Sequence, residues 1–172
     1  MSCVLITGAG GGLGRALARA FSRRGHDLVL ADLDAGQLRE TADELGDPDR
    51  IVLVAGDITD PAHQEEILVR AQTRFGGVRV LVNNAGITHR SPVARTDPKV
   101  LRKVMQVDWQ APLELALSAL PLLDGALDTV AAGIVSSLQP ANVRLRRALR
   151  NQEAFARHPR YPLLFDPQTA GG

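Results

Sequence analysis

The segment TGAGGGLG, Thr7 to Gly14, has the residue types and spacing that can hold a phosphate group. Glycine carries no side chain to block a close approach, so the backbone N–H groups of such a turn can reach a pyrophosphate. An apolar run precedes the segment and apolar residues at helical spacing follow it, so the positive end of a helix would face the phosphates. A tight strand–helix turn that binds nothing is the alternative. The candidate phosphate-binding residues are Thr7, Gly8, Gly12, Leu13 and Gly14.

A carboxylate ends the next apolar run, DLVLAD, at about the distance after the glycines that a dinucleotide site requires. We expect Asp32 to accept hydrogen bonds from the hydroxyls of an adenosine ribose and to repel a 2′-phosphate. This favours NAD over NADP as the cofactor. Leu33, the next residue, belongs to the same candidate site. The alternative is a solvated loop aspartate, because Asp34 follows close by.

Strand and helix patterns alternate through residues 3–112. The apolar runs CVLIT, DLVLAD, IVLVAGD and VRVLVNNAG predict four strands, and amphipathic segments between them predict helices. Asp60–Pro61 and Asp97–Pro98 predict two helix starts, Gly46 and Gly76 predict two helix ends, and Pro112 should kink or end the last helix. Continuous apolar strands with intervening helices predict an α/β fold, a doubly wound Rossmann-type parallel sheet.

The composition excludes several kinds of partner. Aromatic residues make up 3% of the chain and the net charge is +1, so we expect no nucleic-acid partner. No apolar run has transmembrane length and no signal-peptide pattern leads the chain, which predicts no membrane partner and a cytoplasmic location. We interpret the single cysteine, Cys3, as a core residue. His26, His63, His89 and His158 are scattered, so they are predicted to be ordinary surface or loop residues, with no metal site.

With three further motifs the chain resembles the short-chain dehydrogenase/reductase family. These motifs are GDITD around Asp57, NNAG at Asn83 to Gly86, and VMQVDWQAP, in which Asp108 stands where the family has asparagine. The resemblance implies hydride transfer between nicotinamide and an alcohol or carbonyl. It also implies a partial NAD(P)-binding domain over residues 1–112. The cofactor contacts it implies are Asp57 and Ile58 at the adenine, and Asn84, Ala85 and Gly86 along the site.

The catalytic pair of that family is missing from the sequence. The family uses a tyrosine as acid or base, and a lysine four residues later lowers the tyrosine pKa. The only tyrosine here is Tyr161, with Phe165 four residues on, and the only lysines, Lys99 and Lys103, lie far upstream. We therefore assign no catalytic residue. The remaining candidates are Asp108, whose carboxylate cannot copy the donor half of an amide, and Ser137 in GIVSSL, which could equally be a turn serine.

Residues 113–172 resemble a different family, the C-terminal domain of selenophosphate synthetase (selenide, water dikinase). The segments that carry this resemblance are ALPLLDGALDTVAAGIVSSLQPANVRLRRAL and HPRYPLLFDPQTAGG. We therefore predict a second, incomplete α/β segment from residue 113 onward. The domain that carries that family's phosphoryl chemistry has no counterpart in this sequence. A natural fusion, a degraded gene and a truncated chain all remain open.

Three functional hypotheses follow. The first is a short-chain oxidoreductase, the second an NAD-binding module without chemistry, and the third a selenophosphate synthetase remnant. The missing tyrosine–lysine pair predicts an NAD-binding chain that is inactive as it stands. The exposed edge of the fourth strand, or the helix that starts at Asp97, could support a homo-oligomer. We expect the segment AAGIVSSL, residues 131–138, to pack near that strand edge.

Overall fold

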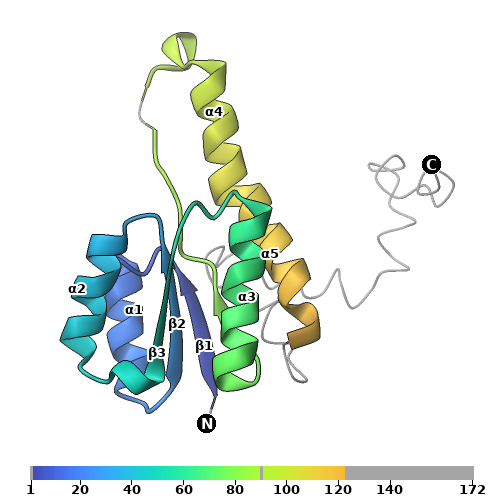
Figure 1. The fold of residues 1–172 in the computed structure, drawn as a ribbon. Coiled ribbons are helices and arrows are strands. Elements are labelled where there is room, and N and C mark those ends of the chain that lie inside the picture. Colours follow the sequence, from blue (N-terminus) through green and yellow to red (C-terminus); the bar gives the residue numbers. More distant parts are fainter. Residues whose placement is uncertain (1, 90, 123–172) are drawn as a thin grey trace, which may run out of the picture. The chain divides into compact units, whose positions relative to one another are not determined.

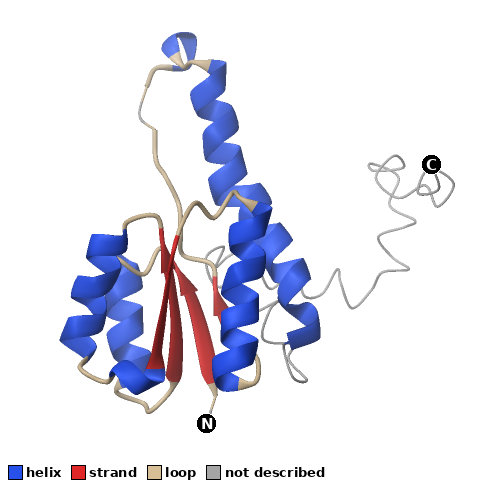
Figure 2. Ribbon diagram, viewed as in Figure 1, coloured by secondary structure: helices blue, strands red, loops and turns tan. Residues whose placement is uncertain are grey.

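The computed structural model describes residues 2–89 and 91–122, which form a parallel sheet between two layers of helices (Figure 1, Figure 2). The strands are β1 (Cys3–Thr7), β2 (Asp27–Asp32), β3 (Ile51–Ala55) and β4 (Val80–Val82). Their order in the sheet is β3-β2-β1-β4, with every pair parallel. The predicted Rossmann-type fold class is confirmed. The second predicted segment lies outside the described residues from position 123 onward.

Helices cover both faces of the sheet. Helices α1 (Gly12–Ser22) and α2 (Ala35–Leu45) lie on one face, and α3 (Pro61–Phe75) and α5 (Ala111–Ala119) lie on the other (Figure 1). Alternate strand side chains supply the two cores, which is why the strands read as continuous apolar runs. Short helical turns are η1 (Pro48–Arg50), η2 (Val93–Arg95) and η4 (Leu120–Leu122). The α1–α2 core contains Val4, Ile6, Leu28, Leu30, Ala18 and Leu38, and the α3–α5 core contains Leu5, Val29, Val54, Ile67 and Leu115.

The helix boundaries that the sequence predicts are present. Asp60 caps α3 by accepting from the Ala62 N–H at 2.9 Å, and Asp97 caps α4 (Pro98–Met105) by accepting from the Lys99 N–H at 2.8 Å. Gly46 ends α2 with a φ of 73°, a left-handed conformation that favours glycine. The Asp60 cap fixes where α3 begins after β3, at the carboxyl edge of the sheet, and Gly46 fixes where α2 ends before β3.

The chain stays helical through Pro112, although a kink or an end is expected there. Helix α4 ends at Met105, a π-helix η3 (Gln106–Gln110) follows, and α5 begins at Ala111. Pro112 therefore lies in the first turn of α5, and the widened turn of η3 directly before it accommodates the proline within a continuous helix. No residue of α4 is buried, and α4 extends past the carboxyl ends of the strands (Figure 1).

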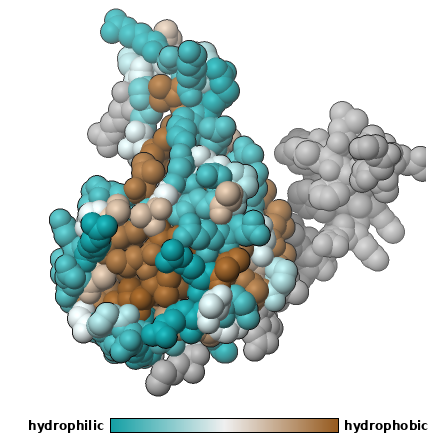
Figure 3. Space-filling model, in the orientation of Figure 1, coloured by the Kyte–Doolittle hydropathy of each residue, from teal (hydrophilic) through white to brown (hydrophobic). Residues whose placement is uncertain are grey.

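The outer strand β3 leaves apolar surface exposed. Figure 3 shows a hydrophobic area over this strand, between α2 and α3, and Ile51, Val52 and Leu53 are only partly buried. The segment at residues 131–138 that we expect beside β4 lies outside the described residues. Within residues 2–89 and 91–122, no helix is long and apolar enough to cross a membrane, and no cluster of side chains could hold a metal ion.

Candidate cofactor site

A cavity of about 480 Å³ lies at the carboxyl ends of the strands. Open parallel sheets bind ligands at this edge, where the strand order reverses between β1 and β4. All predicted cofactor residues except Gly12 and Gly14 border the cavity. They are Thr7, Gly8, Leu13, Asp32, Leu33, Asp57, Ile58, Asn84, Ala85 and Gly86. Residues that sequence reasoning missed also border it, namely Gly11, Ala31, Gly56, His63, Ile87, Lys103 and Val107.

The glycine-rich turn is packed on one side and open on the other. A Cβ atom at Gly14 would lie 1.9 Å from the Gly8 carbonyl oxygen, so Gly14 lets α1 pack closely on the turn instead of bordering the cavity. Gly12 has a φ of 50°, and a Cβ atom there would meet nothing within 4 Å. Gly11 caps α1 without a side-chain hydrogen bond, and the first turn of α1 holds no acidic residue. This end of α1 therefore suits a negatively charged phosphate.

The loop after β4 is tied to the end of β1. The backbone N–H groups of Asn84 and Ala85 both donate to Thr7 Oγ1 at 3.0 Å. Asn84 Nδ2 also donates to the carbonyl oxygens of Thr7 and Gly8, at 3.1 and 3.0 Å. The Asn84 amide also lies against α1, since a Cβ atom at Gly14 would be 2.8 Å from Asn84 Nδ2, so these bonds join the loop after β4 to the glycine turn beside the start of that helix. The NNAG motif therefore acts here through its contacts with the turn as well as by bordering the cavity.

Asp32 keeps hydrogen-bonding capacity for a ligand. Its Oδ2 accepts from the Gly10 N–H at 2.8 Å, and its Oδ1 accepts from the Asp34 N–H at 3.1 Å. A carboxylate can accept about four bonds, so both oxygens can also accept from ribose hydroxyls. Leu33 beside it is 74% exposed at the cavity rim. Asp32 thus presents acceptors to the cavity, which suit the hydroxyl groups of a ribose.

Asp57 is held as an ionised acceptor. Its Oδ1 accepts from the Thr59 N–H at 2.9 Å and from Thr59 Oγ1 at 2.7 Å, and its Oδ2 accepts from Lys103 Nζ at 3.0 Å. The Thr59 bonds, followed by Lys103, lower the Asp57 pKa to about 2. The carboxylate therefore remains an acceptor at neutral pH, as the amino group of an adenine would require. Lys103 was not predicted at this site, because it comes from α4, far from Asp57 in the sequence.

The prediction for His63 was wrong. This side chain is only 7% exposed and borders the cavity instead of lying on the surface. Its ring packs against Gly56, where a Cβ atom would lie 2.5 Å from Nδ1. Nε2 has no hydrogen-bond partner among the described residues. The glycine directly after β3 was the available signal, since only glycine leaves room for this ring.

Comparison with known proteins identifies the family. Residues 2–138 match the family model described as short chain dehydrogenase. The chain belongs to the short-chain dehydrogenase family. The matched range runs past residue 112, where we expect the first domain to end, and the position of that boundary remains a prediction.

Curated short-chain dehydrogenases resemble the chain over much of its length. It is 38% identical over 138 residues to the short chain dehydrogenase/reductase dpmpG of Macrophomina phaseolina, covering 75% of this chain and 79% of that protein. It is 35% identical to the dehydrogenase/reductase SDR family member 7B of Bos taurus, covering 70% of this chain but 39% of that protein. The chain thus spans most of the first relative but well under half of the second.

Solved short-chain dehydrogenase structures share the fold. A glucose/ribitol dehydrogenase from Brucella melitensis superposes with a TM-score of 0.69 at 35% identity, covering 71% of this chain and 52% of that one. A 3-ketoacyl-(acyl-carrier-protein) reductase from the same organism, complexed with NADH, gives 0.67 at 31% identity, covering 70% and 50%. The chain therefore spans about half the length of these structures.

Asp108 marks a departure from the short-chain dehydrogenase pattern. It lies in η3, and its Oδ1 accepts from the Ile87 N–H at 2.8 Å. The carboxylate thus anchors the loop after β4. Ser137 and Tyr161 lie outside the described residues.

Proposed function

We propose that this chain binds NAD in the cavity at the carboxyl edge of the sheet. The observation that carries the proposal is the meeting of the glycine turn, Asp32 and Asp57 around one cavity. The turn and the start of α1 would hold the pyrophosphate, Asp32 the adenosine ribose, and Asp57 with Ile58 the adenine. Asn84, Ala85 and Gly86 would border the remainder of the dinucleotide. When bound, the nicotinamide would supply the hydride acceptor.

We propose that Asp32 selects NAD over NADP. Calorimetric titration of the purified chain should show NAD binding at least about tenfold tighter than NADP binding, since a 2′-phosphate would meet a carboxylate. Asp32→Ala should weaken NAD binding by about tenfold and reduce the preference. Asp43→Ala, a change on the exposed surface of α2, serves as the control and should behave as wild type. Equal affinity of the wild type for both cofactors would contradict the assignment.

We further propose that the chain is a family oxidoreductase without activity of its own. The support is in the sequence: Phe165, not lysine, stands four residues after the only tyrosine. A protein saturated with NAD should give no reduced nicotinamide absorbance with a panel of primary and secondary alcohols. Turnover of any of them would contradict the inactivity. Such turnover would show that this chain itself catalyses hydride transfer from an alcohol to NAD.

Our proposals for residues 113–172 do not depend on the proposed binding of NAD. Their resemblance to selenophosphate synthetase supports a remnant or fusion of that enzyme, and we expect no selenide-dependent ATP cleavage. A cytoplasmic location also remains a prediction. ATP cleavage that requires selenide would make the C-terminal part the functional one.

We propose that an apolar stripe on α4, η3 and α5 forms a contact between two copies of the chain. Its side chains are exposed and recur at every fourth position. Such a surface on a protein domain commonly marks an interface. The stripe consists of Leu101, Met105, Trp109, Leu113 and Leu117.

A further inference from the structure

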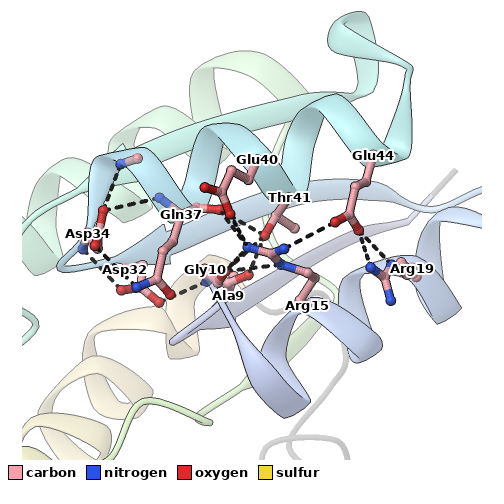
Figure 4. A network of polar contacts seen from close by, with 11 residues as sticks. Ala9, Gly10, Arg15, Arg19, Asp32, Asp34, Gln37, Glu40, Thr41 and Glu44 are labelled. Carbon is pink, nitrogen blue, oxygen red and sulfur yellow. Dashed lines mark hydrogen bonds and ion pairs between the residues drawn. The ribbon is translucent and has the colours of Figure 1, made fainter.

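An arginine on α1 holds the glycine-rich turn from the side away from the cavity. Arg15 Nη2 and Nε both donate to the Gly10 carbonyl oxygen, at 2.7 and 3.1 Å (Figure 4). Arg15 does not border the cavity, whereas Gly11, one residue beyond its contact, does. Arg15 therefore touches the turn and not the space that a ligand would fill.

The peptide groups of Gly10 are fixed at both ends. The Gly10 N–H donates to Asp32 Oδ2 at 2.8 Å, and its carbonyl oxygen also accepts from Thr41 Oγ1 at 3.2 Å. A Cβ atom at Gly10 would lie 2.8 Å from Gln37 Cβ, so this side of the turn is packed against α2. The location of Gly10 thus determines where the next N–H groups of the turn lie.

Helix α2 fixes the guanidinium in turn. Arg15 Nη2 lies 3.0 Å from Glu40 Oε2, and Nη1 lies 3.1 Å from Glu44 Oε1 (Figure 4). Only 20% of the Arg15 side chain is exposed. A planar guanidinium has five donors in fixed directions, so Arg15 can make two bonds to one carbonyl oxygen and one to each of two carboxylates, whereas an ammonium has only three donors. The two carboxylates offset its charge, which suits a structural contact better than a phosphate contact.

We propose that Arg15 is a positioning residue for the cofactor, which fixes Gly10 so that Gly11 and the start of α1 face the pyrophosphate. The role rests on the proposed binding of NAD. It differs from that of the cavity residues because Arg15 acts through the backbone of the turn.

The test separates phosphate recognition from general folding. The full chain is titrated with NAD by calorimetry, and with adenosine, which has base and ribose but no phosphate, by ligand-observed NMR. Arg15→Met should weaken NAD binding by about tenfold, the usual effect of losing a charge-assisted hydrogen bond. It should leave the adenosine affinity unchanged, since Asp32 keeps its bond from the Asp34 N–H.

Arg19→Met is the matched control. Arg19 lies one turn further along α1 and bonds Glu44 through Nε at 2.9 Å, with no bond to the glycine turn among the described residues. It should bind NAD and adenosine as the wild type does. Should Arg15→Met fail to melt cooperatively, Arg15→Lys replaces it. A lysine can keep only one of the two bonds to Gly10, so about a threefold loss of NAD affinity is expected.

Two results would overturn the proposal while leaving NAD binding intact. One is wild-type NAD affinity in Arg15→Met or its replacement. The other is an equal loss of NAD and adenosine affinity, which would make the role merely structural. A wild type that binds no NAD would instead overturn the proposed function, and the positioning role with it.

Discussion

Asp57 borders the candidate site, and its ionised side chain also contributes to the stability of the fold. Its pKa is lowered from 3.8 to about 2, chiefly by the two Thr59 bonds and then by Lys103. Because the folded pKa lies below the unfolded one, the ionised form adds stability above pH 3.8, and this is lost as the pH falls towards 2. Protonation of Asp57 in acid therefore weakens the bonds that it makes to Thr59 and Lys103 beside the cavity.

We expect Asp57→Asn to be less stable than the wild type at neutral pH and to approach it near pH 2. Urea unfolding of both proteins at several pH values measures the difference. Asp43→Asn, which changes an exposed aspartate on α2, is the matched control. A gap for Asp57→Asn that does not close in acid would contradict the ion-pair and hydrogen-bond account.

Some residues of the candidate site could be predicted from the sequence, and others could not. Thr7, Gly8, Asp32 and Asp57 follow directly from strand ends, whose positions the apolar runs predict. Residues such as His63 come from helices, where only tertiary packing decides which face meets the cavity. Periodicity predicts that such a helix exists but not which of its polar residues turns inward.

At the scale of elements, α2 both covers the sheet and holds Arg15. Its N-cap is Asp34, whose Oδ1 accepts from the N–H groups of Gly36 and Gln37 at 2.8 and 3.1 Å. These bonds lower the Asp34 pKa. Removing this cap should therefore lower the stability of the fold and weaken the contacts by which α2 holds Arg15 against the glycine turn.

Asp34→Ala should destabilise the chain, because it removes the side chain that caps the start of α2. Thermal or urea unfolding measures the loss, and Asp43→Ala within the same helix controls for a general effect of removing an acidic residue. Equal stability of the two variants would show that the cap contributes nothing measurable.

The joined helices α4 and α5 show what local patterns leave unspecified. Proline cannot donate to the carbonyl four residues back, and its ring crowds that carbonyl. The chain widens before Pro112 into η3, where the Ala111 N–H donates to the Gln106 carbonyl. The sequence shows that Pro112 must interrupt the regular helical hydrogen bonds. A widened helical turn and a broken helix both accommodate the missing bond, and only tertiary packing determines which of them forms.

At the scale of the whole molecule, the apolar stripe on α4, η3 and α5 makes association testable. Trp109, the only tryptophan, is 62% exposed within the stripe. Its fluorescence emission should shift to shorter wavelength as protein concentration rises, and sedimentation should show a dimer. Leu113→Glu should remain monomeric because a carboxylate would be buried in the contact.

Val69→Glu is the control for that experiment, since Val69 is exposed on α3 outside the stripe. It should associate as the wild type does. A wild type that stays monomeric at every concentration would exclude the stripe as a contact between copies.

The bonds from Asn84 and Ala85 to Thr7 span 77 and 78 residues of sequence. Contacts between such distant residues require closure of a long loop, and they form slowly. The cavity is complete only after this closure, so an early folding species has nothing for NAD to bind. We expect NAD in stopped-flow experiments to slow unfolding in proportion to its saturation and to leave the refolding rate unchanged. The nucleotide would then act as a kinetic lock on the finished chain and not as a template for folding.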